Sequence, residues 1–437
     1  MQYVETGGWA RFAGKRVLLL QGPHGPFFKR VAQSLLYFGA TSVQKIDFNG
    51  GDQFYSSRDA IAYTGSLSEW PKYLNQMMKT HAIDCVMVFG DCRPIHRAAN
   101  QVAHELGAQF WAFEEGYVRP NFITLEPHGV NGHSQLPTDR ASYDQWTLVD
   151  LPKQAQVPSS FWKVTGYSIV YFAATLLMRP RFWRYEHHRP VRVMDGIYWL
   201  RALQRKWYYG FSERNALSDL KGYGGSKPFF VSILQVSLDA QVKMHSGYES
   251  IEQYIQDTAR SFAKNASSES VLVVKHHPMD RGYTDYSRII KRLTKELNLK
   301  DRLRYIHDQH LPTLMSHAQG LVTINSTVGL SALDHDLPVK TLGHAVYDMP
   351  GLTSQRSLDD FWKNAAADKA DPLLHEKFVN YVTAHTQLNG SFYRELPQAG
   401  ISGLHYYDSP ATYPSPLFAH SRRVERHAKK KLTRMTS

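Results

Sequence analysis

Two acidic residues, Glu114 and Glu115, directly follow an apolar run at residues 109–113. A run of this length predicts a buried strand, and strand ends of parallel sheets face the ligand in α/β proteins. Two carboxylates held close together cannot both ionise easily, which is one way to set the pKa of a general acid or base. Because consecutive side chains of an extended segment point to opposite faces, we expect one of them to reach the site. A simple surface turn is the alternative interpretation.

A third carboxylate and an arginine accompany this pair. Asp91 follows the apolar run at residues 85–89, so we expect it at the end of a neighbouring strand. Arg119 comes shortly after Glu115. These types of residue predict a site that combines acid–base groups with a positive charge, although a structural role for Asp91 is the alternative.

A basic segment follows the apolar run at residues 271–274. It consists of Lys275, His276, His277 and Pro278. Lysine and imidazolium suit a phosphate or a carboxylate, and a histidine can donate a proton to a departing phosphate. Adjacent histidines on an extended segment diverge and no third ligand is evident, so we expect no metal here. A structural role for the histidine pair is the alternative.

Small polar residues end another apolar run, at residues 321–324. Asn325, Ser326 and Thr327 stand where a helix is expected to begin at Ser326 and Thr327, and free N–H groups at a helix start favour an anion. The two hydroxyl residues also suit ordinary helix caps. Gln235, after an expected strand at residues 229–234, could add a polar contact to a nucleotide.

A glycine-containing loop follows the first apolar run, at residues 17–20. It contains Gly22, His24 and Gly25, and its glycines permit close backbone approach to an anion before the next helix. The glycine spacing matches neither of the common nucleotide-binding loops, so ATP or NAD binding has little support. A tight structural turn is the alternative.

Short apolar runs alternate with helical patterns in both halves of the chain, which predicts parallel sheets covered on both faces. The fold class expected is α/β, with two Rossmann-like domains facing a cleft in the GT-B arrangement. The expected parts are residues 1–155 (first Rossmann-like domain), 156–225 (connecting helical segment), 226–405 (second Rossmann-like domain) and 406–437 (crossover segment and basic tail).

Length and composition agree with this organisation. The chain has 437 residues, enough for two domains, and its 51 Lys+Arg exceed its 39 Asp+Glu by 12. The excess favours anionic partners, but aromatic residues do not alternate with basic ones, so we expect no nucleic acid. Cys85 and Cys92 are the only cysteines, which excludes a disulfide framework and fits a reducing cytoplasm. The first 20 residues lack the pattern of a secretory signal.

An apolar stretch at residues 167–178 differs from both halves, and Arg179, Arg181 and Arg184 follow it. It is shorter than the about 20 residues that a membrane-spanning helix needs. Two interpretations stay open: a helix lying in the membrane interface, with the arginines on anionic headgroups, or a helix buried between domains. The basic segment at residues 422–434 favours a membrane surface, or is a solvated tail.

Four short motifs at strand ends, in this order, resemble the KpsS/LipB family of capsular polysaccharide proteins. They are Phe89-Gly90-Asp91, Glu114-Glu115-Gly116-Tyr117-Val118-Arg119-Pro120, Lys275-His276-His277-Pro278 and Asn325-Ser326-Thr327-Val328-Gly329-Leu330. The resemblance spans residues 15–350. It implies a retaining β-Kdo glycosyltransferase of GT-B type, which uses CMP-Kdo and starts an oligo-Kdo linker on a phosphatidylglycerol-type lipid.

The resemblance also implies roles for the first-domain residues. Glu115 matches the position of the carboxylate proposed to act at the anomeric carbon, where related dual Kdo transferases have Asp. Asp91 and Glu114 are the alternatives for this role. Retention fits a double displacement through a covalent sugar–carboxylate adduct. Arg119 is expected to neutralise the Kdo carboxylate, and the loop at Gly22, His24 and Gly25 is assigned to the same group or to the acceptor.

In the second domain, the resemblance implies a donor site. Lys275, His277 and Pro278, with His276 between them, match a segment that contacts the CMP phosphate in related transferases. Ser326 and Thr327 match its phosphate loop. No cofactor or metal is expected besides the donor, because CMP is a good leaving group.

The expected partners are CMP-Kdo, a phosphatidylglycerol-type lipid, the anionic surface of the inner membrane and other capsule-assembly proteins. This implies a cytoplasmic protein bound to the inner face of that membrane. A non-catalytic capsule-export or lipid-binding adaptor with a degenerate transferase fold is the alternative.

Overall fold

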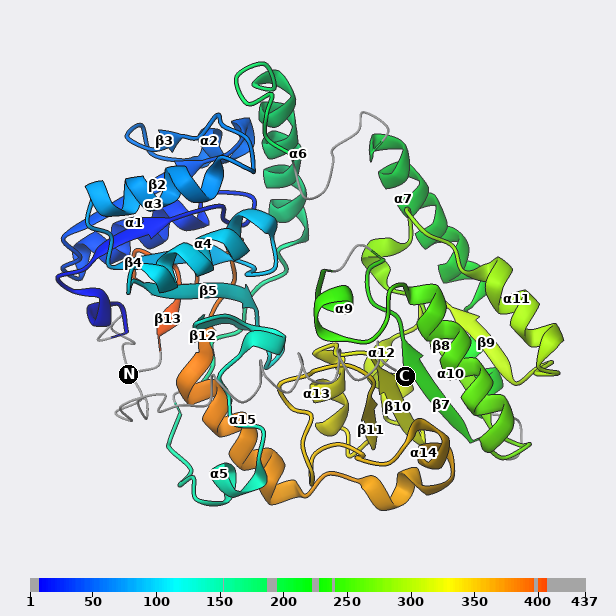
Figure 1. The fold of residues 1–437 in the computed structure, drawn as a ribbon. Helices are drawn as coiled ribbons and strands as arrows, with labels where there is room; N and C mark the ends of the chain where they lie inside the picture. Colours follow the sequence, from blue (N-terminus) through cyan, green and yellow to red (C-terminus); the bar gives the residue numbers. More distant parts are fainter. Residues whose placement is uncertain are drawn as a thin grey trace, which may run out of the picture.

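Two separate β-sheets are the centres of two α/β domains. In Figure 1 the first sheet is coloured blue to cyan, with its last two strands in orange, and the second is green to yellow. This computed structural model describes residues 8–151, 153–186, 195–221, 228–237, 240–396 and 400–406. The basic segment at residues 422–434, which is expected to favour a membrane surface, lies outside the described residues.

The first sheet has a parallel centre and an antiparallel edge. In spatial order its strands are β13 (His405–Tyr406), β12 (Gln387–Asn389), β6 (Phe122–Pro127), β5 (Gln109–Glu115), β4 (Cys85–Phe89), β1 (Arg16–Leu19), β2 (Ser42–Asp47) and β3 (Ile61–Ala62). Strands β1 to β5 are parallel, whereas β6, β12 and β13 pair antiparallel. The strand order reverses between β1 and β4, and ligands of doubly wound sheets bind at such a reversal.

The second sheet is parallel throughout. Its spatial order is β11 (Val339–Thr341), β10 (Gly320–Thr323), β7 (Phe229–Ile233), β8 (Val271–Lys275) and β9 (Leu303–Ile306). Every residue of β7 and β8 is buried, as expected for a sheet with both faces covered. Here the order reverses between β7 and β10.

Helices cover both sheets, and their apolar spacing explains which face is buried. In α1, Phe28, Val31 and Leu35 recur at helical spacing and pack against buried residues of β1. The first domain contains η1 (Trp9–Phe12), α1 (Phe27–Tyr37), α2 (Gly50–Tyr55), α3 (Trp70–Thr80), α4 (Pro94–Glu105), η2 (Asn131–His133) and α5 (Arg140–Asp144). The second contains α9 (Ala240–His245), α10 (Ile251–Asn265), η3 (Pro278–Asp280), α11 (Ser287–Glu296), α12 (Leu311–Met315), α13 (Val328–Leu333), α14 (Leu358–Asn364) and η4 (Ala365–Asp368).

Three helices connect the domains: α6 (Phe161–Leu177), α7 (Asp195–Ser212) and α8 (Ala216–Lys221). Helix α6 packs against the first domain, where Tyr171 Oη contacts Asp52 and Asn49. Helix α7 packs against the second, where Arg205 binds Asp285. In the part of the chain that the structure describes, no helix has the length and apolar character needed to cross a bilayer.

A last helix, α15 (Pro372–Thr386), returns the chain to the first domain (Figure 1). Strand β12 then pairs with β6, and β13 pairs with β12. The side chain of Gln387 accepts hydrogen bonds from the Tyr117 and Val118 N–H groups, at 3.0 and 3.3 Å. The returning segment therefore holds the turn that follows β5.

The expected α/β class with two Rossmann-like domains is confirmed by these two strand orders. Three details differ from the expectations. Strand β6 is antiparallel; residues 387–406 join the first sheet instead of the second domain; and α13 begins at Val328. The returning strands have only three and two residues, and their partner is an edge formed by distant residues, so no local pattern indicates them.

Candidate active site

Strand β5 continues through both acidic residues, because Glu114 and Glu115 pair with Thr124 and Ile123 of β6. Glu114 is half-buried, and its Oε1 accepts a hydrogen bond from the Glu115 N–H at 3.0 Å. Solvent reaches the Glu115 side chain, yet enough protein surrounds its carboxylate to raise its pKa by desolvation; the charge of Arg119 opposes this shift. Glu115 is therefore the accessible carboxylate of the pair.

Asp91, after β4, has a different environment, since it is buried and its oxygens already have partners. Oδ2 accepts hydrogen bonds from the Val130 N–H at 3.0 Å and from His133 Nδ1 at 2.9 Å, and Oδ1 lies 3.2 Å from Cys92 Sγ. Burial alone would raise the pKa of Asp91, but these contacts outweigh it and lower the pKa. The Asp91 carboxylate therefore fixes the positions of the Val130 N–H, the His133 ring and the Cys92 thiol.

Arg119 lies where the first domain approaches the second. Its side chain is exposed, and its Nε donates a hydrogen bond to the Gly116 carbonyl at 3.1 Å. Its positive charge lowers the pKa of the Glu115 carboxyl and also that of the His277 imidazole. Arg119 thus interacts electrostatically with a carboxylate of one domain and a histidine of the other.

His277 is half-buried at the start of η3, and its Nδ1 accepts a hydrogen bond from the Met279 N–H at 3.2 Å. Burial lowers the pKa of His277; Asp280 opposes this shift, while Lys275 and Arg119 add to it. The ring is therefore neutral at pH 7 and, with Nδ1 accepting, has its proton on Nε2. Pro278, next in the chain, is exposed.

The two residues before His277 point into the domain. His276 is buried, with Nδ1 2.6 Å from Tyr305 Oη, and burial lowers its pKa to about 3. Lys275 Nζ donates to the His307 carbonyl at 3.3 Å, and burial, followed by the nearby Arg281, lowers its pKa. His276 comes directly after β8, and its ring packs inside the domain beside the rings of Tyr305 and His307.

The polar residues expected around the nucleotide meet at the reversal of the second sheet. Gln235 Nε2 donates to Asn325 Oδ1 at 2.9 Å, and the Asn325 N–H donates to Gln235 Oε1 at 3.2 Å, so this pair joins the ends of β7 and β10. Ser326 Oγ accepts from the Val328 N–H at 3.2 Å, as a helix cap does. Thr327 is half-buried and makes no such cap bond.

The glycine loop of the first domain lies beneath α6. His24 stacks on Tyr171 with ring centroids 4.2 Å apart, and its Nδ1 is 3.1 Å from Ser168 Oγ. A Cβ at Gly25 would lie 2.7 Å from the Tyr167 ring, and one at Gly22 would lie 2.9 Å from the Phe28 ring. The glycines therefore permit tight packing, and a binding role for this loop stays a prediction.

Glu126, a buried acid on β6, was not among the residues predicted for the site. Its Oε2 accepts a hydrogen bond from Ser134 Oγ at 2.5 Å, and Tyr117 also bonds to it. Burial raises the pKa of Glu126 to about 7, and the charge of Asp91 adds to this effect. An acid inside the apolar run FITLEP was the available signal. The contacts of His133 and His245 were also missed, because these residues are separated in sequence.

Sequence comparisons identify relatives over most of the chain. Residues 84–393 match the profile of a family described as capsule polysaccharide biosynthesis protein. The chain is 41% identical to the capsule polysaccharide export protein KpsS of Escherichia coli over 383 residues, covering 87% of this chain and 97% of the relative. It is 38% identical to the capsule polysaccharide modification protein LipB of Neisseria meningitidis serogroup A over 399 residues, covering 88% and 93% respectively.

Among solved structures, the β-Kdo 2,7 transferase of KpsC from Thermosulfurimonas dismutans aligns with 87% of this chain and 93% of its own. The TM-score is 0.42 and the sequence identity is 16%.

Proposed function

Because the chain belongs to the family of capsule polysaccharide biosynthesis proteins, we propose that it is a retaining glycosyltransferase that moves β-Kdo from CMP-Kdo to a phosphatidylglycerol-type lipid. This transfer would start the glycolipid linker of a capsular polysaccharide. The observation that supports it most directly is the position of Arg119, whose charge acts on both Glu115 and His277. The charge of one guanidinium thus acts on a carboxylate of the first domain and on an imidazole of the second.

In the first step, Glu115 is the nucleophile. Its carboxylate oxygen forms a bond to the anomeric carbon of Kdo, and the bond from that carbon to the CMP phosphate oxygen breaks with its electron pair on the phosphate. Arg119 pairs with the Kdo carboxylate and also favours the ionised form of Glu115. Solvent access to Glu115 is what allows a sugar to approach it.

The second domain holds the donor. His277 presents its Nε2–H to the phosphate as a neutral hydrogen-bond donor, a consequence of the acceptor bond at Nδ1. The Gln235–Asn325 pair, with Ser326 and Thr327, provides polar groups for the nucleotide at the sheet reversal. In the second step, a lipid hydroxyl attacks the anomeric carbon and gives its proton to the phosphate oxygen of the CMP released in the first step. The bond to Glu115 breaks with its electron pair on the carboxylate, and the original configuration is restored.

The lipid acceptor requires access to a membrane, and two helices offer apolar surface for it. Large exposed side chains lie along α6 with its following turn, and along α7: Phe161, Trp162, Ile169, Leu176, Leu177 and Trp183, and Leu200, Leu203, Trp207, Tyr208 and Phe211. Trp162 and Trp207 are 80% and 77% exposed. Both helices lie on the upper side of the molecule in Figure 1, one against each domain.

Cations accompany these apolar side chains. Arg184 stacks over Trp183 at 4.9 Å, and Arg214 stacks over Phe211 at 4.5 Å. Exposed aromatic residues with adjacent arginines are typical of helices that lie in the interface of anionic membranes. We therefore place the protein at the inner face of the inner membrane in this proposal, with other capsule-assembly proteins as partners.

The activity is tested by a product assay with purified protein. CMP-Kdo is generated in situ and supplied with a fluorescent phosphatidylglycerol analogue, and the mass of the lipid is followed. A gain of one Kdo that disappears in Glu115→Gln supports the transferase. No gain with folded protein and intact donor would favour the non-catalytic adaptor.

Membrane binding is tested separately by flotation with phosphatidylglycerol and phosphatidylcholine vesicles. Trp162→Ser and Trp207→Ser should each weaken binding to the anionic vesicles about 30-fold, since a buried aromatic side chain contributes about 2 kcal/mol. Tyr37→Ser, which removes an exposed ring from α1, is the matched control. Equal flotation of all variants would contradict the membrane role of α6 and α7.

A further inference from the structure

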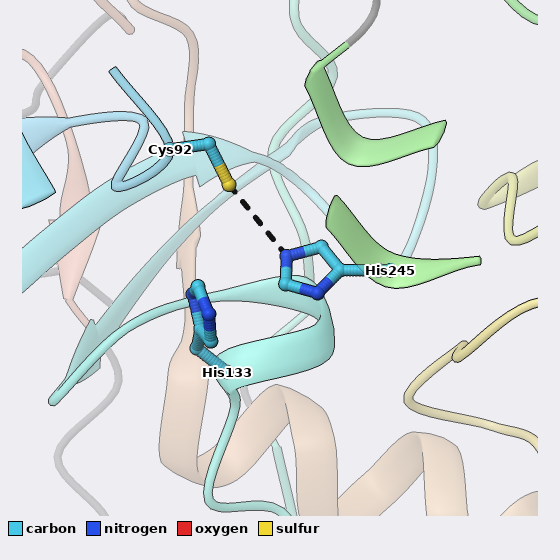
Figure 2. A group of neighbouring side chains, drawn as sticks. All are labelled: Cys92, His133 and His245. Carbon is cyan, nitrogen blue, oxygen red and sulfur yellow. Dashed lines mark hydrogen bonds between the residues drawn. The ribbon is translucent and has the colours of Figure 1, made fainter. Parts of the chain in front are cut away.

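Three potential metal ligands converge between the two domains. Cys92 lies in the loop after β4, His133 ends η2, and His245 ends α9 of the second domain. One ligand atom of each lies within 4.8 Å of the others. The three side chains point toward one another in Figure 2. Among the described residues, this is the group of histidine, cysteine and acidic side chains that has the spacing for a metal.

The separation of the thiol and one imidazole agrees with tetrahedral zinc. With Zn–S of about 2.3 Å and Zn–N of about 2.05 Å, a tetrahedral angle requires a sulfur-to-nitrogen separation of about 3.6 Å. Cys92 Sγ and His245 Nε2 are 3.6 Å apart. The rings of His133 and His245 are nearly perpendicular, with centroids 4.5 Å apart, so both can direct a nitrogen at one point between them.

A carboxylate supports one of the ligands. Asp91 Oδ2 accepts the hydrogen bond from His133 Nδ1 at 2.9 Å, which leaves the lone pair on Nε2 for a cation. Histidine ligands of zinc usually donate their second ring N–H to such a carboxylate. The buried position of Asp91 and its bond from the Val130 N–H fix the orientation of this support.

Glycines make room for the cluster. A Cβ at Gly132 would lie 2.2 Å from His245 Nδ1, and one at Gly129 would lie 2.8 Å from Asp91 Oδ2. His245 is also held in its own domain, because its carbonyl accepts a hydrogen bond from the His344 N–H at 2.7 Å. The side chains are therefore positioned by both domains.

We propose that Cys92, His133 and His245 bind a divalent, borderline-soft cation of the zinc class, which joins the two domains. One thiolate and two imidazoles suit such an ion better than magnesium or calcium, which prefer oxygen ligands. Three protein ligands leave a fourth position for water or a substrate group. The proposal is independent of the identity of the transferred sugar.

Metal binding is measured on the full-length, tag-free chain after removal of bound metal with a chelator. Cobalt(II) is the probe, because a thiolate ligand gives a charge-transfer band in the near ultraviolet and a tetrahedral site gives intense visible bands. We expect one cobalt per chain, displaced by one zinc. The absence of a stoichiometric cobalt spectrum in the wild type would overturn the proposal.

Variants assign the spectrum to its residues. Cys92→Ser should abolish the charge-transfer band. His245→Asn should weaken zinc binding more than about 100-fold, measured in competition with a chromophoric chelator. The loss of a ligand should cost more than the about 10- to 100-fold that follows the loss of a ligand's hydrogen-bond partner. Asp91→Asn should weaken zinc binding by about 10- to 100-fold. Cys85→Ala, which removes the other cysteine and leaves all three ligands, is the matched control. A band that persists in Cys92→Ser, or unchanged affinity in His245→Asn, would refute the site.

Thermal unfolding supplies a second readout. Zinc should raise the Tm of the wild type and of Cys85→Ala, because a ligand that binds only the folded protein stabilises it. The same addition should leave the Tm of Cys92→Ser unchanged. An equal shift in all three proteins would indicate binding at other histidines and would count against the proposal.

Discussion

The ends of two neighbouring strands of the first sheet, β4 and β5, hold carboxylates with opposite environments. Asp91 after β4 is buried, and contacts from His133, Val130 and Cys92 lower its pKa. Glu115 at the end of β5 is reached by solvent, and desolvation by the surrounding protein raises its pKa. A carboxylate whose oxygens already have partners positions its neighbours, whereas one that solvent reaches can meet a substrate. Location at a strand end therefore does not by itself determine the role.

A second contrast, in the direction of the pKa shift, exists between Asp91 and the buried acid Glu126. This acid is as inaccessible as Asp91, but its main charged neighbour is Asp91 itself, so burial and repulsion act in the same direction on its pKa. The negative charge of Asp91 makes ionisation of Glu126 less favourable, and so raises the pKa of Glu126. Because the pKa values of Asp91 and Glu126 shift in opposite directions, the pH dependence of stability can test the structural role of each.

The largest effect we expect is the loss of transfer activity when Glu115, and not Asp91, is the nucleophile that is removed. Glu115→Gln should lower the transfer rate at least about 10³-fold, because removal of a nucleophile eliminates the covalent route. The lipid-mass assay measures the rate. The Tm of this variant should be no lower than that of the wild type, because desolvation disfavours the charge of Glu115 in the folded state.

Retained activity in Glu115→Gln would transfer the nucleophile role to Glu114 or Asp91. A loss of activity together with a loss of Tm would instead mean that Glu115 is structural, and the contrast between the two strand ends would fail.

The next effect concerns the pH dependence of stability. The pKa of Glu126 is about 7 in the folded protein against an ordinary value of 4.5. The folded state therefore binds the proton more tightly, and its stability falls as pH rises from 4.5 to 7 and is then constant. The free energy of unfolding should decrease by about 3 kcal/mol over this range because of Glu126.

Glu126→Gln tests this, because a neutral amide cannot ionise. Urea unfolding at several pH values should give a flatter profile, with the variant more stable than the wild type at pH 8. Identical slopes in both proteins would show that Glu126 ionises normally.

A smaller effect is expected for Asp91. Asp91→Asn should lower the free energy of unfolding at pH 7 by about 2 kcal/mol, because a buried, charge-assisted set of hydrogen bonds is weakened. The pKa of Asp91 is lower in the folded state, so its contribution exists above the ordinary value of 3.8 and is lost below it. The difference in unfolding free energy between variant and wild type should shrink as pH falls through this range. A constant difference would mean that the charge of Asp91 is not what stabilises the fold.

Much of this arrangement could be predicted from local patterns. The apolar runs before Asp91, Glu114 and Lys275 become strands β4, β5 and β8, since continuous burial selects apolar residues. The Gln235–Asn325 contact follows from the same logic, because two adjacent parallel strands end at one sheet edge. Apolar runs and the turn residues that end them are sufficient to predict these strands and the residues at their ends.

Other features depend on contacts between distant residues, which periodicity does not reveal. Gln387 supports the turn at Tyr117 only because the chain returns to the first sheet. His276 is next to His277 in sequence, yet its ring is buried against Tyr305 and His307, which come from a later strand and loop. His133 and His245 meet through the approach of two domains. These relations are fixed by tertiary packing, so no single-sequence motif indicates them.

The smallest effect we expect distinguishes the two adjacent acids of β5. Glu114 accepts a hydrogen bond from the Glu115 N–H, and a glutamine at this position retains an oxygen that can accept the same bond. Glu114→Gln should therefore lower kcat/KM by about 1 kcal/mol in transition-state stabilisation, or roughly five-fold, by loosening the position of Glu115. The loss should appear in kcat, while KM for CMP-Kdo stays nearly constant, because the donor is held by the second domain. A loss as large as that of Glu115→Gln would mean that the two carboxylates act as one unit, and the buried and exposed strand ends would then differ in accessibility alone.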